Sequence, residues 1–253
     1  MSRRKRKFQQ EAQQRLRQQD DTAQEVEITE QIQPRTPNQA KYIQAIREKD
    51  FVSCTGPAGS GKSFLGIALA LQFLREGKVN KIVLTRPVVE AGEKLGFLPG
   101  TAQEKIDPYL RPVYDALSTL LGPDQYRSLI ARDVIQIIPL AYMRGITFEN
   151  AFIILDEAQN TTVEQIIMAI TRLGQGSKMI CNGDIQQIDL PSNKKSGLVA
   201  LREIVGYSTL ASFIEFTDED VVRHPFVREV VKGYAVWKQV QIQQSHIHKE
   251  KVY

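Results

Sequence analysis

Short apolar runs alternate with longer amphipathic segments along most of this 253-residue chain. Six of the runs have the length and the apolar content of strands that are buried on both faces. They are Phe51–Thr55, Lys81–Thr85, Val134–Ile138, Ala151–Leu155, Lys178–Asn182 and Phe213–Phe216. Because helical patterns separate these runs, we predict an α/β fold with a mostly parallel sheet that helices cover on both faces.

Two of the predicted helices begin with a capping pattern. Residues 36–39 read Thr-Pro-Asn-Gln, which predicts a capping box and a helix that runs to about Lys49. Thr162 and Gln165 have the same spacing and predict a second capped helix. Further helices are expected over residues 64–71, which are apolar nearly all round, and over residues 225–237.

The composition divides the chain into a domain and two tails. Residues 1–35 are basic, rich in Gln and too poor in large apolar residues to form a core element. Residues 36–240 hold all the predicted strands, and residues 241–253 form a polar tail. Within the domain, residues 88–133 contain several Gly and Pro and only helical patches such as Val113–Leu121. We interpret them as an insertion that carries partner or substrate contacts.

The net charge of +4 is unevenly distributed. Residues 1–19 contain seven Arg or Lys and one Glu, which gives +6, so the remaining residues carry −2. A basic arm of this kind often touches nucleic acid, and it is equally compatible with a solvated tail that keeps the protein soluble.

Composition excludes several classes of protein. No apolar run is long enough to span a membrane, and the basic N-terminus lacks the apolar stretch of a signal peptide. Cys54 and Cys181 lie in apolar, strand-like runs, so we expect core thiols, not a disulfide framework. That expectation fits a reducing cytoplasm.

Gly56–Ser63 fits the pattern G-x-x-x-x-G-K-[ST] of the phosphate-binding loop, between a predicted strand and a predicted helix. This context predicts a RecA-like P-loop NTPase that binds ATP or another nucleoside triphosphate with Mg²⁺. Lys62 would reach the β- and γ-phosphates, and Ser63 would hold the metal. The alternative is a glycine turn that happens to precede a helix. The residues expected to contact the nucleotide are Gln39, Gly56, Pro57, Ala58, Gly59, Ser60, Gly61, Lys62, Ser63 and Phe64.

Gln39 has two interpretations. Its position in the capping pattern favours a role at the helix N-terminus. Its amide could instead bond both the donor and the acceptor on the edge of adenine.

Acidic residues follow the most apolar strand of the chain. Asp156 is expected to hold Mg²⁺ directly or through water, and Glu157 is the natural general base for the attacking water. Gly183–Asp184 follows the next strand, and with Gln187 it resembles the third motif of superfamily 1 helicases. That resemblance implies that Gln187 senses the γ-phosphate. Plain solvated turns are the alternative in both places.

A cation opposite the developing charge would complete the site. The candidates are Arg86, Arg144 and Arg223, since each lies near the end of a predicted strand or helix. Arg223 is our first choice, supplied by a second copy of the chain. The alternative is a local salt bridge to the acids at positions 218–220.

Six blocks resemble the PhoH-like ATPases, a P-loop family related to superfamily 1 helicases, and the resemblance covers about residues 36–235. The blocks are Gly56–Ser63, Leu84–Pro87 with Gly92–Gly100, Arg144–Phe148, Ile154–Asn160, Gly183–Asp184 with Gln187–Pro191, and Asp220–Pro225.

The resemblance implies a cytoplasmic, Mg-dependent protein that hydrolyses ATP. It also implies RNA or single-stranded DNA as partner and a homo-oligomer, with a hexameric ring as one expected form. Gln39 matches the glutamine motif of the family, which favours adenine contact. Short members are common in phage genomes, and the length fits that source.

Other functions stay open at this stage. We expect no added nuclease or RNA-binding domain before residue 36 or after residue 240. A ribonuclease accessory, a non-catalytic nucleic-acid-binding oligomer and, less favoured, a P-loop kinase are the alternatives.

Overall fold

A computed structural model describes residues 26–29, 32–87 and 102–222, together with residues 226, 227, 229, 230, 233, 234 and 237. Of residues 102–109 only the backbone is described. The basic arm, all residues after 237, which include the predicted tail 241–253, and residues 88–101 of the predicted insertion lie outside the described part, as does Arg223.

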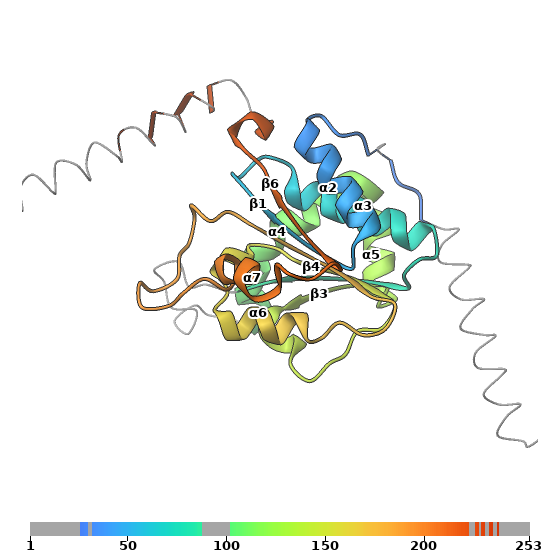
Figure 1. Cartoon of the computed structure of the whole chain (residues 1–253). Helices are drawn as coiled ribbons and strands as arrows, with labels where there is room; N and C mark the ends of the chain where they lie inside the picture. The colour runs from blue at the N-terminus through green and yellow to red at the C-terminus, as the bar shows by residue number, and fades with distance from the viewer. Residues whose placement is uncertain are drawn as a thin grey trace, which may run out of the picture.

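Six strands form one sheet in the order β3-β2-β4-β5-β1-β6, and all five pairings are parallel (Figure 1). The strands are β1 (Phe51–Thr55), β2 (Lys81–Arg86), β3 (Ile135–Pro139), β4 (Ala151–Leu155), β5 (Lys178–Gly183) and β6 (Ala211–Glu215). The predicted α/β, RecA-like P-loop fold with a parallel sheet is confirmed. Since β5 lies between β1 and β4, the loops that follow these three strands meet at one edge of the sheet.

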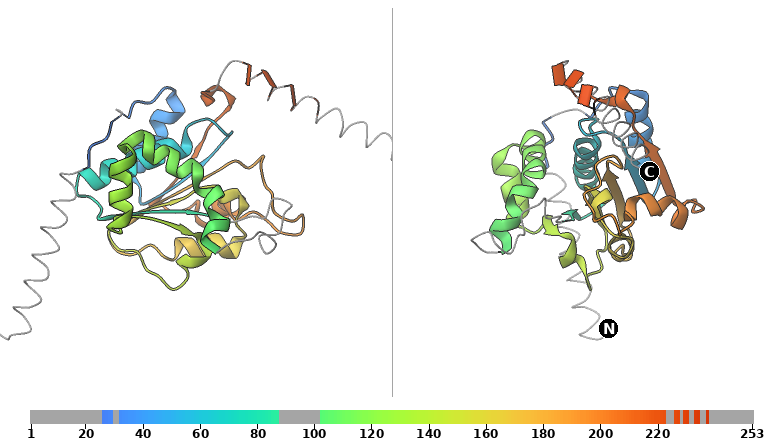
Figure 2. Two further views of the ribbon diagram at one scale, coloured as in Figure 1. Left: turned by 180° about the vertical axis from the view of Figure 1, so that it is seen from behind. Right: turned by 90° about the vertical axis from the view of Figure 1, so that its left-hand side faces the viewer.

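Helices cover both faces of the sheet (Figures 1 and 2). One core contains buried residues of α2 (Pro37–Glu48), α3 (Lys62–Arg75), α4 (Ala102–Leu121) and α5 (Pro123–Ala131). The other contains residues of α6 (Val163–Ile170) and α7 (Gly197–Val205). Along β2, Ile82 and Leu84 belong to the first core and Val83 to the second, as side chains alternate between the faces of a strand. Three short 3₁₀ helices complete the description: η2 (Leu140–Met143), η3 (Ala158–Asn160) and η4 (Asp218–Asp220).

Residues 102–131 are more regular than we predicted. They form two helices, α4 and α5, where we expected only helical patches, and α7 and the 3₁₀ helices were not predicted at all. Pro108 and Pro112 suggested breaks, but the buried residues Val113, Leu117 and Leu120 have helical spacing and join the first core. This part of the predicted insertion therefore packs as a layer of the domain.

The chain also enters the core earlier than the predicted boundary at residue 36. Val26 is buried in the first core, and the Thr29 N–H donates a hydrogen bond of 2.9 Å to the Leu120 carbonyl at the end of α4. Ile28 and Ile32 pack against the same core. These few apolar residues lie in the polar segment 1–35, so the average composition of that segment did not indicate that they are buried.

Of the helices in the described part, none is long and apolar enough to cross a membrane.

Candidate active site

The phosphate loop joins β1 to α3 through glycines in the left-handed region of backbone space. Gly56 has φ of 148° and Gly61, directly before α3, has φ of 89°. A Cβ at Gly56 would lie 2.6 Å from both the Cβ and the carbonyl oxygen of Phe216. The loop thus needs glycine here both for its conformation and for close packing on the chain that follows β6.

Lys62 is the first residue of α3 and is only 7% exposed. Its Nζ donates hydrogen bonds to the Gly56 carbonyl at 2.7 Å, the Pro57 carbonyl at 2.8 Å and the Ser60 Oγ at 3.2 Å. Burial lowers the pKa of Lys62, and the nearby carboxylates, Asp184 foremost among them, act in the opposite direction. The ammonium therefore lies curled within the loop, with oxygen ligands that phosphate oxygens can replace.

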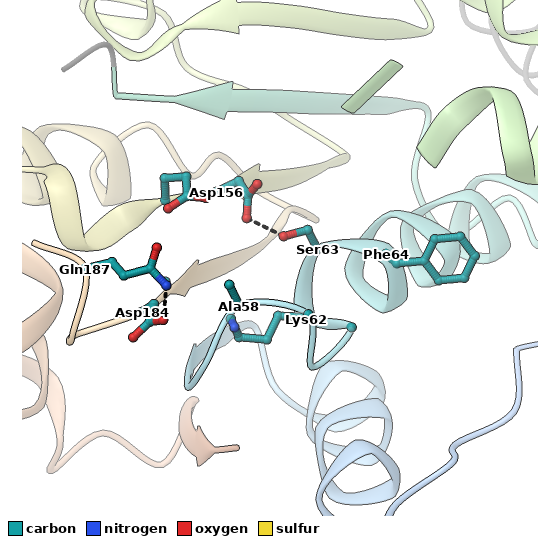
Figure 3. A pocket seen from close by; sticks show the side chains of 11 residues that line it. Ala58, Lys62, Ser63, Phe64, Asp156, Asp184 and Gln187 are labelled. Carbon is teal, nitrogen blue, oxygen red and sulfur yellow. Dashed lines mark hydrogen bonds between the residues drawn. The ribbon is translucent and has the colours of Figure 1, made fainter. Parts of the chain in front are cut away.

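Ser63 and Asp156 meet although they are far apart in the sequence. The Ser63 Oγ donates a hydrogen bond of 2.6 Å to Asp156 Oδ1 at the end of β4 (Figure 3). Burial raises the pKa of Asp156, while Arg86 and the Ser63 hydrogen bond oppose the rise. A hydroxyl and a carboxylate are the hard oxygen ligands that suit Mg²⁺, which is usually bound by one or two protein groups and the substrate phosphates. In the described part, no group of three or more His, Cys, Asp or Glu side chains could hold a metal ion.

Glu157 is held on both carboxylate oxygens. Its Oε1 accepts a hydrogen bond of 2.9 Å from Arg86 Nη2, and its Oε2 accepts one of 2.6 Å from Gln159 Nε2. Its own backbone is left-handed, with φ of 53°, a costly conformation for a residue other than glycine. Arg86 also approaches Asp156, with Nε 3.8 Å from Oδ2. Of the three candidate arginines, Arg86 therefore lies beside the acidic pair within the same chain.

Asp184 and Gln187 face the phosphate loop from the end of β5 (Figure 3). Gln187 Nε2 donates a hydrogen bond of 2.6 Å to Asp184 Oδ2, and the Gln186 N–H donates one of 2.9 Å to Asp184 Oδ1. The turn is thus ordered by its own carboxylate, with the Gln187 amide at the cavity.

Two cavities adjoin the loop. The first, of about 230 Å³, is lined by the loop together with Asp156, Glu157, Asp184 and Gln187. The second, of about 770 Å³, is lined by residues that include Gln39, Leu120 and Val222. Gly59, Gly61 and Phe64 line both. Figure 3 shows the Phe64 ring directed away from Asp156 and Gln187. The first cavity has the groups for phosphates, and the second has room for a nucleoside.

Gln39 closes only part of the predicted capping box. Its N–H does donate to the Thr36 Oγ1, at 3.2 Å, so Thr36 is the predicted N-cap. Its side chain, only 3% exposed, does not return to the Thr36 N–H. Oε1 accepts from the Arg35 N–H at 2.7 Å, and Nε2 donates to the Ser60 carbonyl at 3.0 Å. The amide ties the segment before α2 to the phosphate loop, and adenine contact stays a prediction.

A family model described as PhoH-like protein matches residues 31–235 of this chain. The chain belongs to the PhoH-like protein family. Among curated relatives, it is 52% identical to a PhoH-like protein of Bacillus subtilis over 80% of this chain and 64% of the relative. It is 42% identical to Protein PhoH of Escherichia coli over 82% of this chain and 59% of that protein. The chain thus spans about 60% of the length of these relatives.

A solved structure, the large terminase from a thermophilic bacteriophage, is similar with a TM-score of 0.47 and 16% identity. The similarity covers 79% of this chain and 50% of that chain.

The structure does not place the two other candidate arginines of the PhoH-like chain, Arg144 and Arg223, at the cavities. Arg144 is exposed after η2 and lines neither cavity. Arg223 lies outside the described residues, but the N–H of its neighbour Val222 donates a hydrogen bond of 3.1 Å to the Gly59 carbonyl of the phosphate loop. The backbone just before Arg223 is therefore anchored on the loop.

Asp220, one of the acids suggested as a local partner for Arg223, is buried and already bound. Its carboxylate accepts hydrogen bonds from Thr36 Oγ1, from Asn38 Nδ2 at 2.9 Å and from the Thr217 N–H at 2.8 Å. Burial acts to raise the pKa of Asp220, but these hydrogen bonds prevail and lower it. Asp220 thus joins the start of α2 to the segment after β6.

Sequence reasoning missed two residues of this site, Gln159 and Asp220. Gln159 contacts Glu157, Asp184 and Gln187, but a Gln in a 3₁₀ turn has no local signal. Asp220 stood in an acidic run that looked solvent-exposed, and only its hydrogen bonds to Thr36 and Asn38 distinguish it.

Proposed function

We propose that this PhoH-like chain binds ATP with Mg²⁺ and hydrolyses it to ADP and phosphate. The observation that carries the proposal is the 2.6 Å hydrogen bond between Ser63 and Asp156, with Lys62 and Glu157 at the same cavity. A phosphate loop and an acidic strand end that meet in this way form a site for a metal-bound triphosphate.

Each residue of the site has a separate role in the proposed hydrolysis. Lys62 would exchange its loop carbonyls for β- and γ-phosphate oxygens. Ser63 and Asp156 would hold Mg²⁺, which when bound neutralises phosphate charge. Glu157 accepts a proton from the attacking water. The water oxygen bonds to the γ-phosphorus, the bond from that phosphorus to the bridging oxygen breaks, and ADP leaves with the bridging oxygen. Arg86, 2.9 Å from Glu157, supplies positive charge beside these groups.

The second cavity supports a purine nucleoside as the remainder of the substrate. It adjoins the phosphate cavity through the loop glycines and Phe64, and Gln39 lies in its wall. A buried amide with one further donor and one further acceptor site suits the adenine edge.

We further propose that hydrolysis is coupled to RNA or single-stranded DNA in a cytoplasmic homo-oligomer. The basic arm supports a nucleic-acid partner, since its +6 charge would release counterions from phosphates. The two cysteines are free and buried, which suits a reducing compartment.

Steady-state hydrolysis of γ-labelled ATP, with and without RNA and single-stranded DNA, tests both proposals. We expect the label to appear as free phosphate, faster when one nucleic acid is present. Label on a small acceptor would indicate a kinase instead, and ATP binding without turnover would indicate a non-catalytic oligomer.

A further inference from the structure

A single buried amide connects the acidic pair to the turn after β5. Gln159 is 1% exposed, and its Nε2 donates to Glu157 Oε2 at 2.6 Å and to the Gln187 carbonyl at 3.2 Å. Its Oε1 accepts from the Asp184 N–H at 3.1 Å. One side chain therefore contacts the proposed base and both ends of the segment that presents Gln187.

The orientation of this amide is determined by its surroundings. A flipped amide would turn Oε1 toward the Glu157 carboxylate and Nε2 toward the Asp184 N–H, and both contacts would be repulsive. The Ser196 Oγ donates a hydrogen bond of 2.7 Å to the Gln159 carbonyl and holds its backbone. A Cβ at Gly183 would lie 2.5 Å from Gln159 Oε1, so the amide is also closely packed.

The next residue provides a natural comparison. Asn160 also binds the turn after β5 through its amide: Oδ1 accepts from the Asp189 N–H at 2.8 Å, and Nδ2 donates to Asp189 Oδ2 at 3.4 Å. The described hydrogen bonds of the Asn160 side chain do not reach Glu157; only the backbone N–H of Asn160 does, donating 3.0 Å to the Glu157 carbonyl, and a side-chain substitution keeps that bond. Two adjacent side-chain amides thus tether the same turn, and of the two only that of Gln159 is bonded to the Glu157 carboxylate.

We propose that Gln159 is a positioning residue that holds the Glu157 carboxylate for proton acceptance and links its position to the segment that presents Gln187. The inference rests on the proposed hydrolysis of ATP. Arg86 holds one oxygen of Glu157 and Gln159 the other, so loss of Gln159 frees one side of the base. A base displaced by a fraction of an ångström still permits nucleotide binding but no longer accepts the proton efficiently.

Two near-isosteric substitutions in the full chain test the proposal. Gln159→Met removes the amide that contacts Glu157, and Asn160→Leu removes the matched amide that does not. We expect kcat to fall by about 10²-fold in Gln159→Met with the ATP Kd changed by less than about threefold. In Asn160→Leu we expect kcat to fall by less than about tenfold.

A further variant separates positioning from folding. As a carboxylate, the side chain of Gln159→Glu keeps an acceptor for the Asp184 N–H but cannot donate to Glu157, so above the pKa of that carboxyl we expect a loss in kcat like that of Gln159→Met. Adding Gln159→Met to a Glu157→Gln protein should change single-turnover hydrolysis by less than about twofold, because the two side chains act as one unit.

Equal losses of kcat in Gln159→Met and Asn160→Leu would overturn the inference, since tethering of the turn would then explain both. Wild-type kcat in Gln159→Met or Gln159→Glu would overturn it as well. Failure of the proposed function shows itself separately, as absence of ATP hydrolysis by the wild-type protein.

Discussion

The two halves of the candidate site are built in different ways. The phosphate loop comes from one contiguous stretch, Gly56–Ser63, and acts largely through its backbone and Lys62. The hydrolytic half is assembled at the ends of three strands, and side chains make its contacts. Arg86 is the last residue of β2, Glu157 and Gln159 follow β4, and Gln187 follows β5. Binding is therefore a local property of the chain, whereas the proposed hydrolysis depends on the order of strands in the sheet.

The largest effect is expected from a substitution in the phosphate loop, the binding half of the site. Lys62→Ala takes away the one motif cation at the phosphate cavity, so we expect turnover to fall by about 10³-fold or more, with ATP binding strongly weakened. Equilibrium binding of a fluorescent ATP analogue and steady-state hydrolysis measure the two losses. Lys78→Ala, on an exposed lysine paired with Glu76, is the control and should behave as wild type. Near-normal turnover in Lys62→Ala would show that this loop does not bind the substrate.

A missing cation from a second copy would extend the hydrolytic half beyond one chain. If Arg223 acts in trans, Arg223→Ala should lose about 10³-fold in turnover, and mixing it with Lys62→Ala should restore part of the activity. The reason is that a mixed interface holds one intact Lys62 and one intact Arg223.

Mixing Lys62→Ala with Glu157→Gln is the matched control, because both residues line one cavity of one chain and no mixed site regains both. Activity linear in protein concentration, with no rescue in either mixture, would leave Arg223 without a role in the site.

Glu157→Gln separates the halves within one chain. Charge and basicity are lost while shape is kept, so kcat should fall by about 10²–10⁴-fold with ATP still bound. Glu164→Gln, a nearby acid in the first turn of α6, should leave kcat unchanged. Turnover of Glu157→Gln at the wild-type rate would mean that another group accepts the proton.

The backbone of the binding half can be tested by stability alone. Gly56→Ala combines positive φ with a Cβ 2.6 Å from Phe216, so we expect a loss of about 2–5 kcal/mol in the free energy of unfolding. Gly77 has φ of 65°, but a Cβ built there meets no heavy atom of the described residues within 4 Å apart from its chain neighbours, so the free energy of unfolding of Gly77→Ala should fall by only about 1–2 kcal/mol. Urea denaturation measures both. Equal losses would show that close packing on Phe216 adds nothing to the backbone cost.

The smallest expected effect lies outside both halves. Deleting residues 1–19 removes a charge of +6, so the slope of log affinity for single-stranded nucleic acid against log salt should become shallower by up to about 4. Replacing residues 3–7 by Gln keeps the arm length and should flatten the slope in part. An unchanged slope would indicate a solvated tail, and ATP hydrolysis without nucleic acid should not change in either variant.

Much of the fold followed from local patterns. β1 and β4 have the predicted bounds, and Thr162 with Gln165 forms the predicted capping box, because buried strands and helix starts depend on neighbouring residues. β6 lies earlier than predicted, at Ala211–Glu215, since half-buried residues at a sheet edge define strand ends poorly. Residues 102–131 were misjudged because Pro108 and Pro112 suggested breaks. The helical spacing of the apolar residues there is explained only by their contact with the first core.

The phosphate loop and the two acids could be predicted without a structure, because each motif is contiguous and its expected chemistry depends on residue type and spacing. The groups that meet these residues from distant parts of the chain are set by the packing of the whole domain. The pairing of β2 with β4 sets Thr85 opposite Leu155 and so brings Arg86 beside Glu157, and the pairing of β4 with β5 brings Gln159 against Asp184. Strand order is a property of the whole core, in which every layer must bury its apolar face, so no local pattern around Arg86 or Gln159 specifies these contacts.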